Sequence, residues 1–468
     1  MNKSDSERIS AVLELAGFTA SVNEKDADLV VVNACSVRQP AVDRVLGRKK
    51  IWRKMREKNP HFRVVVTGCV LPADKASLKR NKIVDLVFNI KELGELPEML
   101  KSVQSAAPEG SARRAYERSS VQVNKCHETG LQYNILSRSD LFEDLRSDIL
   151  GEIGCDYLEI KPAYSSKFSA FVPIMTGCNN YCSYCAVPYT RGAEVSRPFD
   201  EVIAEVRSLV KKGYKEIYLL GQNVNSYKTT DTTNLRTNTT DITDTTDFVS
   251  LCRKIDEISG EFWVRFMSSN PYDFPDELIE FLAGSKHFCK GLHLAMQSGD
   301  DEVLQKMNRR YNSEMFLNLA AKIRKAIPDV TLSTDVIVGF CGESNDAFLQ
   351  TVEAVKKSRF SQIFIGQYST RPGTVAAKMF KDNVAKSIKV ERDKKINVVL
   401  HKIAKKENER FIGRTMKVLV EGQKVGKLFG RNEQGIGIVF EGPERLVGEF
   451  VSVEVKKAGA FGLEGLLK

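Results

Sequence analysis

Apolar and polar positions alternate between helical and extended patterns along the N-terminal part of the chain. Four apolar residues recur at the spacing of one helix face: Ile9, Val12, Leu13 and Ala16. Three short apolar runs have the composition of buried strands: residues 28–33, 62–67 and 84–88. Helical and extended segments that alternate in this way predict a parallel sheet with crossover helices. We therefore expect an α/β domain over residues 1–105.

Cysteines follow the first two of these runs, Cys35 in N-A-C and Cys69 in T-G-C. Because the carboxyl ends of parallel strands meet at one edge of a sheet, both thiols are expected on the same edge.

Residues 106–164 carry no sustained period, and we expect a long linker with a helix or two. Cys126 and Cys155 fall in this range without partner spacing and are interpreted as incidental thiols.

Repeated strand–helix patterns fill residues 165–410. Their apolar runs, each followed by a helical pattern, lie at residues 171–175, 217–220, 263–267, 292–295, 330–338 and 363–367. Units of this kind predict a partial (β/α)6 barrel. Residues 228–247 interrupt the pattern and are nearly all Thr, Asp and Asn. This segment is too polar to bury against a core, so a disordered surface loop is expected there.

The last segment, residues 411–468, is rich in glycine and carries short runs in which apolar and polar residues alternate. This pattern predicts a small β-barrel. Basic residues are interleaved with the predicted strands: Lys417, Lys424, Lys427 and Arg431. They favour RNA binding, and a barrel that serves only oligomerisation is the alternative.

The composition is that of a soluble globular protein, since 42% of its 468 residues are hydrophobic and 28% are charged. No apolar stretch approaches the ~20 residues that span a bilayer, and residues 1–16 are too polar for a secretory signal. We therefore expect a cytoplasmic protein without membrane contact, in which the ten cysteines act as metal ligands or buried thiols. The net charge of +10 permits a polyanionic partner but does not identify one.

Three cysteines lie within G-C-N-N-Y-C-S-Y-C: Cys178, Cys182 and Cys185. The spacing C-x3-C-x2-C supplies one thiolate fewer than a closed four-iron cage takes, which leaves one iron free to bind a small molecule. Such an open iron indicates chemistry rather than a structural role. Two alternatives stay open at this point, a zinc site that lacks its fourth ligand and chance clustering of structural thiols.

Further motifs extend over nearly the whole chain: V-P-Y-T-R-G, L-L-G-Q-N-V-N-S-Y, K-M-N-R-R-Y, I-V-G-F-C-G-E and S-T-R-P-G-T. Together with the cysteine motif they resemble the radical S-adenosylmethionine enzymes and, within them, the tRNA methylthiotransferases. The resemblance implies an N-terminal methylthiotransferase domain, a radical S-adenosylmethionine core and a C-terminal TRAM domain. It also implies two [4Fe-4S] clusters, S-adenosylmethionine, a tRNA substrate, an electron donor such as flavodoxin or ferredoxin, and a monomer.

The activity that the resemblance implies is addition of a methylthio group to C-2 of N(6)-dimethylallyladenosine, beside the anticodon of tRNA. V-P-Y-T-R-G and G-Q-N-V-N-S-Y favour this substrate. Two alternatives keep the chemistry and change the target, either to threonylcarbamoyl-adenosine in tRNA or to an aspartate of a ribosomal protein. A third alternative is an N-terminally truncated RNA-binding remnant with one cluster.

The resemblance also assigns residues to sites. The cluster that binds S-adenosylmethionine would be held by Cys178, Cys182 and Cys185, and the second cluster would take Cys35 and Cys69. Contacts to S-adenosylmethionine are implied for Tyr184, Gly221, Gln222, Asn223, Ser268, Gln297, Ser298 and Asp335. Binding of tRNA phosphate or base is implied for Arg191, Arg197, Arg309, Tyr311 and Arg371. For each polar residue a turn, a helix cap or a salt bridge is the alternative.

The N-terminal domain of this family opens with a strand that ends in G-C-Q-M-N and is followed by x-x-D-S-E. Residues Met1 to Glu7 match this pattern from the methionine onward, so the first ligand of the second cluster would precede Met1. We expect that the start was assigned at an internal methionine. We also expect the helix over residues 6–16 to lack its partner strand and to expose apolar surface, with no other segment in that place.

Overall fold

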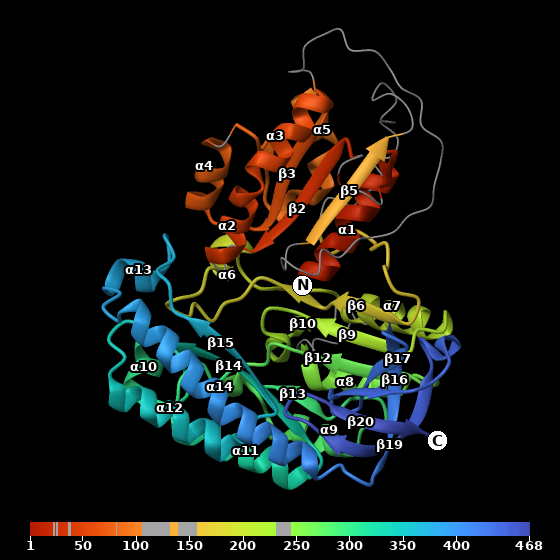
Figure 1. The fold of residues 1–468 in the computed structure, drawn as a ribbon, viewed down its shortest axis with the longest axis vertical. Coiled ribbons are helices and arrows are strands. Elements are labelled where there is room, and N and C mark those ends of the chain that lie inside the picture. Colours follow the sequence, from red (N-terminus) through yellow and green to blue (C-terminus); the bar gives the residue numbers. More distant parts are fainter. Residues whose placement is uncertain are drawn as a thin grey trace, which may run out of the picture.

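The computed structural model describes residues 1–21, 24, 27–35, 39–80, 82–104, 132–138, 157–230 and 245–468. An N-terminal α/β domain lies on top of a larger α/β core, and a C-terminal barrel packs at the side of that core (Figure 1). This arrangement confirms the predicted fold class. Within the described ranges, no helix has the length and apolar character of a membrane span.

The N-terminal sheet has the strand order β1-β5-β2-β3-β4. Its strands are β1 (Phe18–Ala20), β2 (Leu29–Cys35), β3 (Arg63–Cys69), β4 (Leu86–Val87) and β5 (Gln132–Arg138). The strands β2, β3 and β4 run parallel to one another, as predicted. By contrast, β5 pairs antiparallel with β2 on one side and with β1 on the other. It comes from the range 106–164, so the prediction of a long linker with a helix or two is wrong for residues 132–138, which form a strand of the sheet.

Helices flank this sheet: α1 (Asn2–Leu15), α2 (Gln39–Gly47), α3 (Lys49–Lys58), α4 (Pro72–Arg80), the 3-10 helix η2 (Ile90–Glu95) and α5 (Leu96–Gln104). On α1, the predicted apolar face is completely buried at Ile9, Val12 and Leu13. These side chains form one cluster with Leu29 and Val31 of β2, and α1 also packs along β5. The expectation that this helix exposes apolar surface, with no segment beside it, is therefore wrong.

The core is built on parallel strands: β6 (Ser169–Pro173), β9 (Glu216–Leu220), β12 (Trp263–Phe266), β13 (Gly291–His293), β14 (Thr331–Val338) and β15 (Gln362–Gln367). They form the sheets β12-β9-β6 and β13-β14-β15. Parallel bridges from Val264 to Phe288 and from Ser269 to Leu294 join the two sheets at β12 and β13. The strands predicted from the sequence thus form one continuous layer, which confirms the partial (β/α)6 barrel.

Long helices flank these strands: α7 (Phe199–Lys211), α8 (Phe248–Asp256), α9 (Asp276–Gly284), α11 (Ser313–Ala326), α12 (Asn345–Ser358) and α14 (Lys386–Glu409). Shorter helices are α6 (Val187–Thr190), α10 (Asp301–Lys306) and α13 (Val375–Met379). The Thr- and Asp-rich interruption begins and ends as an antiparallel ladder of β10 (Lys228–Thr230) with β11 (Thr245–Asp247). Its residues 231–244 lie outside the described ranges, so the predicted loop stays a prediction there.

The C-terminal unit is a closed barrel, which confirms the predicted architecture. Its strands are β16 (Thr415–Lys424), β17 (Lys427–Asn432), β18 (Gly437–Phe440), β19 (Phe450–Ala458) and β20 (Leu463–Leu467). The turn between β17 and β18 docks on the amino ends of core strands, where the Lys290 amide donates to the Glu433 carbonyl oxygen at 3.1 Å. Thr331, the first residue of β14, donates its hydroxyl to the Gln434 carbonyl oxygen. The barrel therefore sits away from the carboxyl ends of the strands.

Candidate functional site

The cysteine loop, residues 177–185, follows β7 (Met175–Thr176) at the carboxyl end of β6. Gly177 opens the loop with a φ of +79°, and a Cβ at this position would lie 1.9 Å from the Ala193 carbonyl oxygen. Only glycine permits so close an approach. The amide of Cys178 donates to the Gly192 carbonyl oxygen at 3.3 Å. Close packing and a hydrogen bond thus fix the start of the loop.

The K-M-N-R-R-Y turn after α10 holds the middle of the cysteine loop. Ser183 donates its amide to the Met307 carbonyl oxygen at 3.0 Å and its hydroxyl to the Lys306 carbonyl oxygen at 2.7 Å. Asn308 Nδ2 donates to the Tyr181 carbonyl oxygen at 3.0 Å. Tyr181 has a φ of +46°, which is rare for a bulky residue, so the loop needs this support. No role was predicted for Ser183 or Asn308, although the K-M-N-R-R-Y motif contains Asn308 and marks this turn.

The thiols of the loop are free, with Cys178 buried and Cys182 and Cys185 partly exposed. Burial raises the pKa of Cys178, and burial together with the charge of Cys182 raises the pKa of Cys185 to about 12. Neighbouring thiolates therefore repel one another, and bound cations relieve that repulsion.

Among the described residues, no three His, Cys, Asp or Glu side chains converge on the position of a single metal ion. The fit to an iron–sulfur cluster rests instead on the donor set. The cysteine loop offers three soft sulfur donors, each available to a different iron.

An arginine and a tyrosine that were predicted to bind tRNA lie against the cysteine loop. Arg309 Nη1 donates to Cys182 Sγ at 3.2 Å, and Nη2 donates to the Ala295 carbonyl oxygen at 2.8 Å. The third nitrogen, Nε, donates to the hydroxyl of Tyr311 at 3.0 Å. Tyr311 in turn donates to the Ala295 carbonyl oxygen at 2.7 Å. Both side chains thus join the loop to the segment that follows β13.

The segment after β9 brings Gly221, Gln222 and Asn223 to the carboxyl edge of the strands. A Cβ on Gly221 would lie 2.5 Å from Met175 Cγ, so only glycine fits beside β7. Asn223 Nδ2 donates to Asp273 Oδ2 at 2.8 Å, which fixes the amide. Gln222 Oε1 is buried and has no hydrogen-bond partner within the described part of the chain. A buried acceptor without a partner is costly, and a ligand that donates to it removes the cost.

Further predicted residues follow the carboxyl ends of β12 and β13 or lie within β14. Ser268 and Gln297 have φ values of +69° and +64°, so both strand ends turn sharply at non-glycine residues. The Gln297 amide donates to the Asp335 carbonyl oxygen at 2.8 Å. Asp335 Oδ2 lies 3.1 Å from His293 Nε2, which orients the carboxylate. The strand ends therefore present an ordered polar edge.

Two predicted cofactor contacts are engaged within the protein. Ser298 Oγ lies 3.3 Å from Thr351 Oγ1 and accepts from the Asp300 amide at 3.2 Å. The ring of Tyr184 packs edge-on against Phe340, with 6.4 Å between the ring centroids. Ser298 thus stabilises a turn, which was the stated alternative, and Tyr184 packs against a neighbouring ring.

Arg191 forms a buried ion pair, which is the stated alternative to its predicted role in tRNA binding. Its side chain is 1% exposed and forms an ion pair through Nη2 with Asp5, which is fully buried. Tyr157 donates its hydroxyl to the same carboxylate. Arg191 Nε donates to Cys69 Sγ at 3.0 Å. Because Arg191 belongs to the core and Asp5 to the N-terminal domain, this buried network joins the two units.

Arg197 is also engaged within the protein, since its Nη1 lies 2.6 Å from Glu205 Oε2 and donates to the Pro173 carbonyl oxygen at 3.1 Å. The alternative of a salt bridge therefore holds for Arg197. Arg371 is buried, at 4% exposure, in the turn before α13. Its carbonyl oxygen accepts from the Thr374 hydroxyl at 2.8 Å.

Cys35 and Cys69 are register partners at the ends of β2 and β3, on one edge of the sheet as predicted. Gly68 precedes Cys69 with a φ of +106°, and a Cβ there would lie 2.2 Å from the Ala34 carbonyl oxygen. Glycine therefore permits the close pairing of the two strand ends. Three cysteine side chains lie outside the described residues: Cys35, Cys126 and Cys155.

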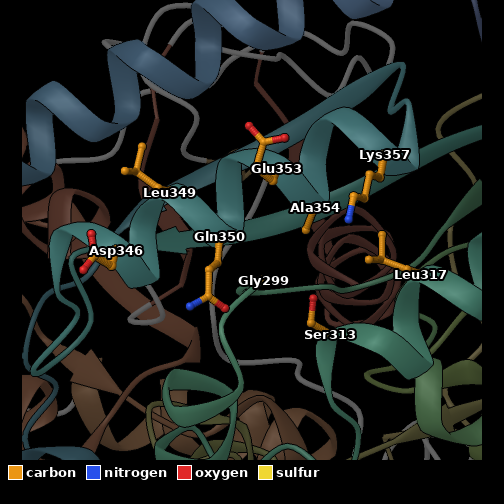
Figure 2. A pocket seen from close by; sticks show the side chains of 9 residues that line it. All are labelled: Gly299, Ser313, Leu317, Asp346, Leu349, Gln350, Glu353, Ala354 and Lys357. Atoms are coloured by element: carbon orange, nitrogen blue, oxygen red, sulfur yellow. The ribbon is translucent and has the colours of Figure 1, made fainter.

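A separate cavity of about 370 Å³ opens between α11 and α12, on the outer helical layer (Figure 2). Ser313 and Leu317 of α11 line it together with Gln350 and Glu353 of α12. None of the predicted site residues lines this cavity, so it is not part of the candidate site.

Family models match three stretches of the chain. The Radical SAM superfamily matches residues 172–355, the uncharacterized protein family UPF0004 matches residues 1–89, and the TRAM domain matches residues 409–468. These stretches lie in the core, the N-terminal domain and the C-terminal barrel, respectively.

Curated relatives align along nearly the full chain. The tRNA-2-methylthio-N(6)-dimethylallyladenosine synthase of Clostridium botulinum is 35% identical over 99% of this chain and 94% of its own. The protein of the same name in Carboxydothermus hydrogenoformans is 36% identical over 100% of this chain and 97% of its own. The solved structure of the radical S-adenosylmethionine methyltransferase TsrM of Kitasatospora setae aligns with a TM-score of 0.47 at 16% identity, over 75% of this chain and 64% of that one. By the identity and coverage of the curated relatives, the chain belongs to the tRNA-2-methylthio-N(6)-dimethylallyladenosine synthase family of radical S-adenosylmethionine proteins.

Proposed function

We propose that this protein adds a methylthio group to C-2 of N(6)-dimethylallyladenosine beside the anticodon of tRNA. The observation that carries the proposal is the cysteine loop at the carboxyl edge of the core, in a chain that aligns over 94% and 97% of the length of two synthases of that name. The relatives' shared name favours this substrate over threonylcarbamoyl-adenosine and over a ribosomal aspartate. The complete cysteine loop favours an enzyme over an RNA-binding remnant.

Cys178, Cys182 and Cys185 would hold one [4Fe-4S] cluster through three of its irons and leave the fourth iron to S-adenosylmethionine. When bound, the two cofactors together supply the radical that removes a hydrogen atom from the substrate. The chain itself binds, orients and shields these groups. Gly177 and the Ser183 contacts hold the thiols in place, because they fix the loop at its start and its middle.

The polar edge formed by the strand ends would bind S-adenosylmethionine. Gln222 Oε1 is an acceptor for an ammonium or hydroxyl donor, since it has no partner among the described residues. Gly221 lets Met175 pack against the backbone at this edge, because a Cβ there would lie 2.5 Å from Met175 Cγ. The Asp335 carboxylate, oriented by His293, is a second acceptor at this edge. The remaining predicted contacts shape the walls: Tyr184, Asn223, Ser268, Gln297 and Ser298.

A second [4Fe-4S] cluster would take ligands from Cys35 and Cys69. These positions fit because the two cysteines are backbone register partners at the ends of adjacent parallel strands. Arg371 stays the proposed contact of the substrate nucleotide, whereas Arg309 and Tyr311 are engaged with Cys182 and Ala295. Arg191 and Arg197 are left out of this role because their guanidinium groups are engaged in buried contacts.

The C-terminal barrel would contact tRNA phosphates through the β16–β17 hairpin. Lys424 and Lys427 are exposed at its tip, whereas Lys417 and Arg431 pair with acidic side chains, Glu261 and Glu421. Exposed lysines bind phosphate without reading base sequence.

We further propose a monomer that works in the cytoplasm with an electron donor of the flavodoxin or ferredoxin type.

Expression in a bacterial strain that lacks its own synthase tests the function. Mass spectrometry of digested tRNA is expected to show the 2-methylthio form of N(6)-dimethylallyladenosine with the wild-type chain and not with Cys182→Ala. Cys252→Ala is the matched control, because Cys252 is a fully buried thiol of α8 in the hydrophobic core. A folded, iron-loaded wild-type chain that leaves this nucleoside unmodified, or that methylthiolates another one, would overturn the proposal.

A further inference from the structure

Arg309 holds a positive charge at the cysteine loop without an acidic partner. Its guanidinium nitrogens donate to a thiol sulfur and to two neutral oxygens, on Cys182, Ala295 and Tyr311. No Asp or Glu of the described residues forms an ion pair with it. The nearby carboxylate of Asp335 is paired with His293 instead.

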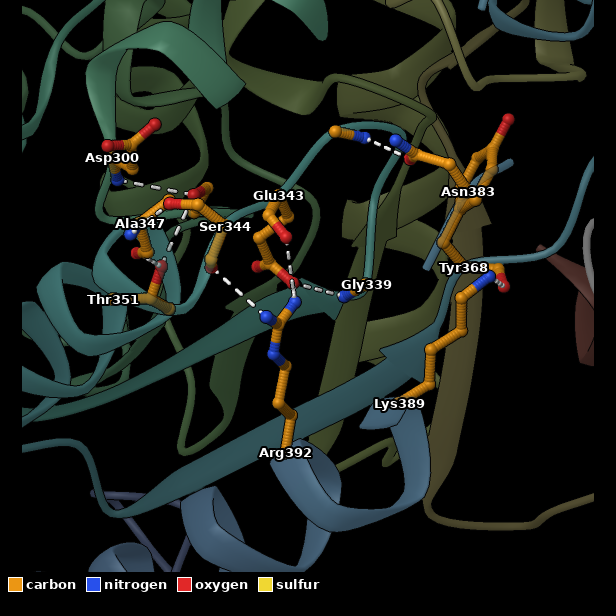
Figure 3. A network of polar contacts seen from close by, with 12 residues as sticks. Asp300, Gly339, Glu343, Ser344, Ala347, Thr351, Tyr368, Asn383, Lys389 and Arg392 are labelled. Atoms are coloured by element: carbon orange, nitrogen blue, oxygen red, sulfur yellow. Dashed lines mark hydrogen bonds and ion pairs between the residues drawn. The ribbon is translucent and has the colours of Figure 1, made fainter. Parts of the chain in front are cut away.

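Four buried arginines of the core each face a carboxylate. Figure 3 shows one of them, where Arg392 reaches Glu343 and the carbonyl oxygen of Ser344. The corresponding pairs elsewhere are Arg191 with Asp5, Arg197 with Glu205 and Arg265 with Glu216. A cation removed from water needs compensation, and in these cases a carboxylate supplies it. At Arg309 the group in that position is the sulfur of Cys182.

Sulfur of an iron–sulfur cluster is an anionic acceptor, and donors to it stabilise negative charge on the cluster. Hydrogen bonds to the sulfurs and the net charge nearby are known determinants of cluster reduction potential. Charge-assisted hydrogen bonds are stronger than neutral ones. Arg309 combines both effects, since one N–H points at Sγ and the whole guanidinium is positive at any working pH.

We propose that Arg309 is the built-in counter-charge of the cluster at the cysteine loop and that it makes this cluster easier to reduce. The proposal rests on the proposed function, which assigns the cluster to Cys178, Cys182 and Cys185. Reduction adds one electron from an external donor and moves no atom. The reduced cluster is more negative by one charge, so a fixed cation beside it stabilises the reduced form more than the oxidised form.

The expected size follows from Coulomb's law. A unit charge at about 6 Å, with an effective dielectric constant of about 20, changes an equilibrium constant roughly a hundredfold. Arg309 is partly exposed, so water reduces this effect. We expect Arg309→Met to lower the ratio of reduced to oxidised cluster at a fixed potential about tenfold, which is about 59 mV for a one-electron couple.

A redox titration of the full-length, anaerobically reconstituted protein tests the proposal. A Cys69→Ala background restricts the cluster signal to the cysteine loop, and iron analysis first establishes that the wild-type loop is loaded. The midpoint is then followed by electron paramagnetic resonance for Arg309→Met, Arg309→Gln and Arg309→Lys. Arg310→Met is the matched control, because it removes the same charge from the next residue, whose guanidinium lies over the exposed ring of Tyr272.

The proposal expects more negative midpoints for Arg309→Met and Arg309→Gln, and values near wild type for Arg309→Lys and Arg310→Met. Iron loss from the two neutral variants, with native circular dichroism and a loaded Arg309→Lys, would also support a requirement for charge. Unchanged midpoints in the neutral variants, an equal shift in Arg310→Met, or iron loss in Arg309→Lys would overturn it. If the wild-type loop takes up no iron, the proposed function itself is contradicted. The iron analysis shows this before any variant is compared.

Discussion

An Arg191→Met variant removes the cation that joins the core to the N-terminal domain. Both side chains of the Arg191–Asp5 pair are buried, at 1% and 0% exposure. In the variant, Asp5 keeps the Tyr157 hydroxyl as a donor but loses its counter-charge. Removing one partner of a buried pair costs about 3–5 kcal/mol, because the other charge is left uncompensated. We expect a loss of that size in the free energy of unfolding of the N-terminal domain.

Urea unfolding followed by tryptophan fluorescence measures this loss. The chain has two tryptophans, Trp52, which is fully buried in the N-terminal domain, and Trp263 in the core. A Trp263→Phe background leaves Trp52 as the reporter of the domain that contains Asp5. Arg191→Met, Asp5→Asn and the double variant form a double-mutant cycle in this background. The control is Lys456→Met, which removes an exposed cation and is expected to cost less than about 1 kcal/mol.

The double variant separates a buried ion pair from two independent contacts. With both partners replaced, neither charge is left alone in the interior, so the double variant is expected to lose less than the sum of the single variants. A loss below about 1 kcal/mol for Arg191→Met, or strictly additive losses in the cycle, would contradict the role given to this pair.

Three further predictions concern other parts of the chain. Gly177→Ala forces a Cβ against a carbonyl oxygen, so we expect a clear loss of iron per chain after reconstitution. Gly213→Ala is the control, because Gly213 has a similar positive φ and no atom within 4 Å of the added Cβ, and it is expected to keep its iron. Gln222→Leu removes a buried acceptor that has no partner in the described structure, so thermal unfolding should show a stabilisation of about 1 kcal/mol. The same variant should bind S-adenosylmethionine more weakly in equilibrium dialysis. Two lysines lower the pKa of Glu454 from 4.5 to about 2. Its contribution to barrel stability is therefore complete above pH 4.5 and is lost as the pH falls toward 2. Carbon-13 NMR titration of labelled glutamate measures this pKa, and Glu454→Gln should remove that part of the acid dependence.

The strands of the core and the barrel were predictable because their patterns are local. The strand β9 is buried at every residue from Glu216 to Leu220. A buried strand of this kind is recognised in the sequence as a short apolar run, independently of its neighbours in the sheet. The strand β5 differs, because its place is set by ladders to β1 and β2. Those partners lie about a hundred positions away along the chain. No local pattern in residues 132–138 specifies such a pairing.

The candidate site was predictable in position but not in contacts. The rule that ligands gather at carboxyl strand ends predicted that Gly221, Gln222 and Gln297 lie together at one edge, and the structure has them after β9 and β13. The rule does not say whether an arginine nearby faces a cavity or a carboxylate. The partner of Arg191 is Asp5, which is 186 positions away in the sequence. Both residues belong to motifs, but neither motif indicates which residue its charged side chain pairs with. The ion pair could therefore be identified only from the structure.

The segment from Cys185 to Arg191 links the two groups of cysteines. At its start the Val187 amide donates to Cys185 Sγ at 3.4 Å, and at its end Arg191 Nε donates to Cys69 Sγ at 3.0 Å. Because the helix α6 (Val187–Thr190) rises about 1.5 Å per residue, the backbone from Val187 to Arg191 covers only about 6 Å. Separation of the N-terminal domain from the core would break the buried Arg191–Asp5 pair. Under the proposed function, this linkage keeps the thiols of both clusters within reach of one bound nucleotide.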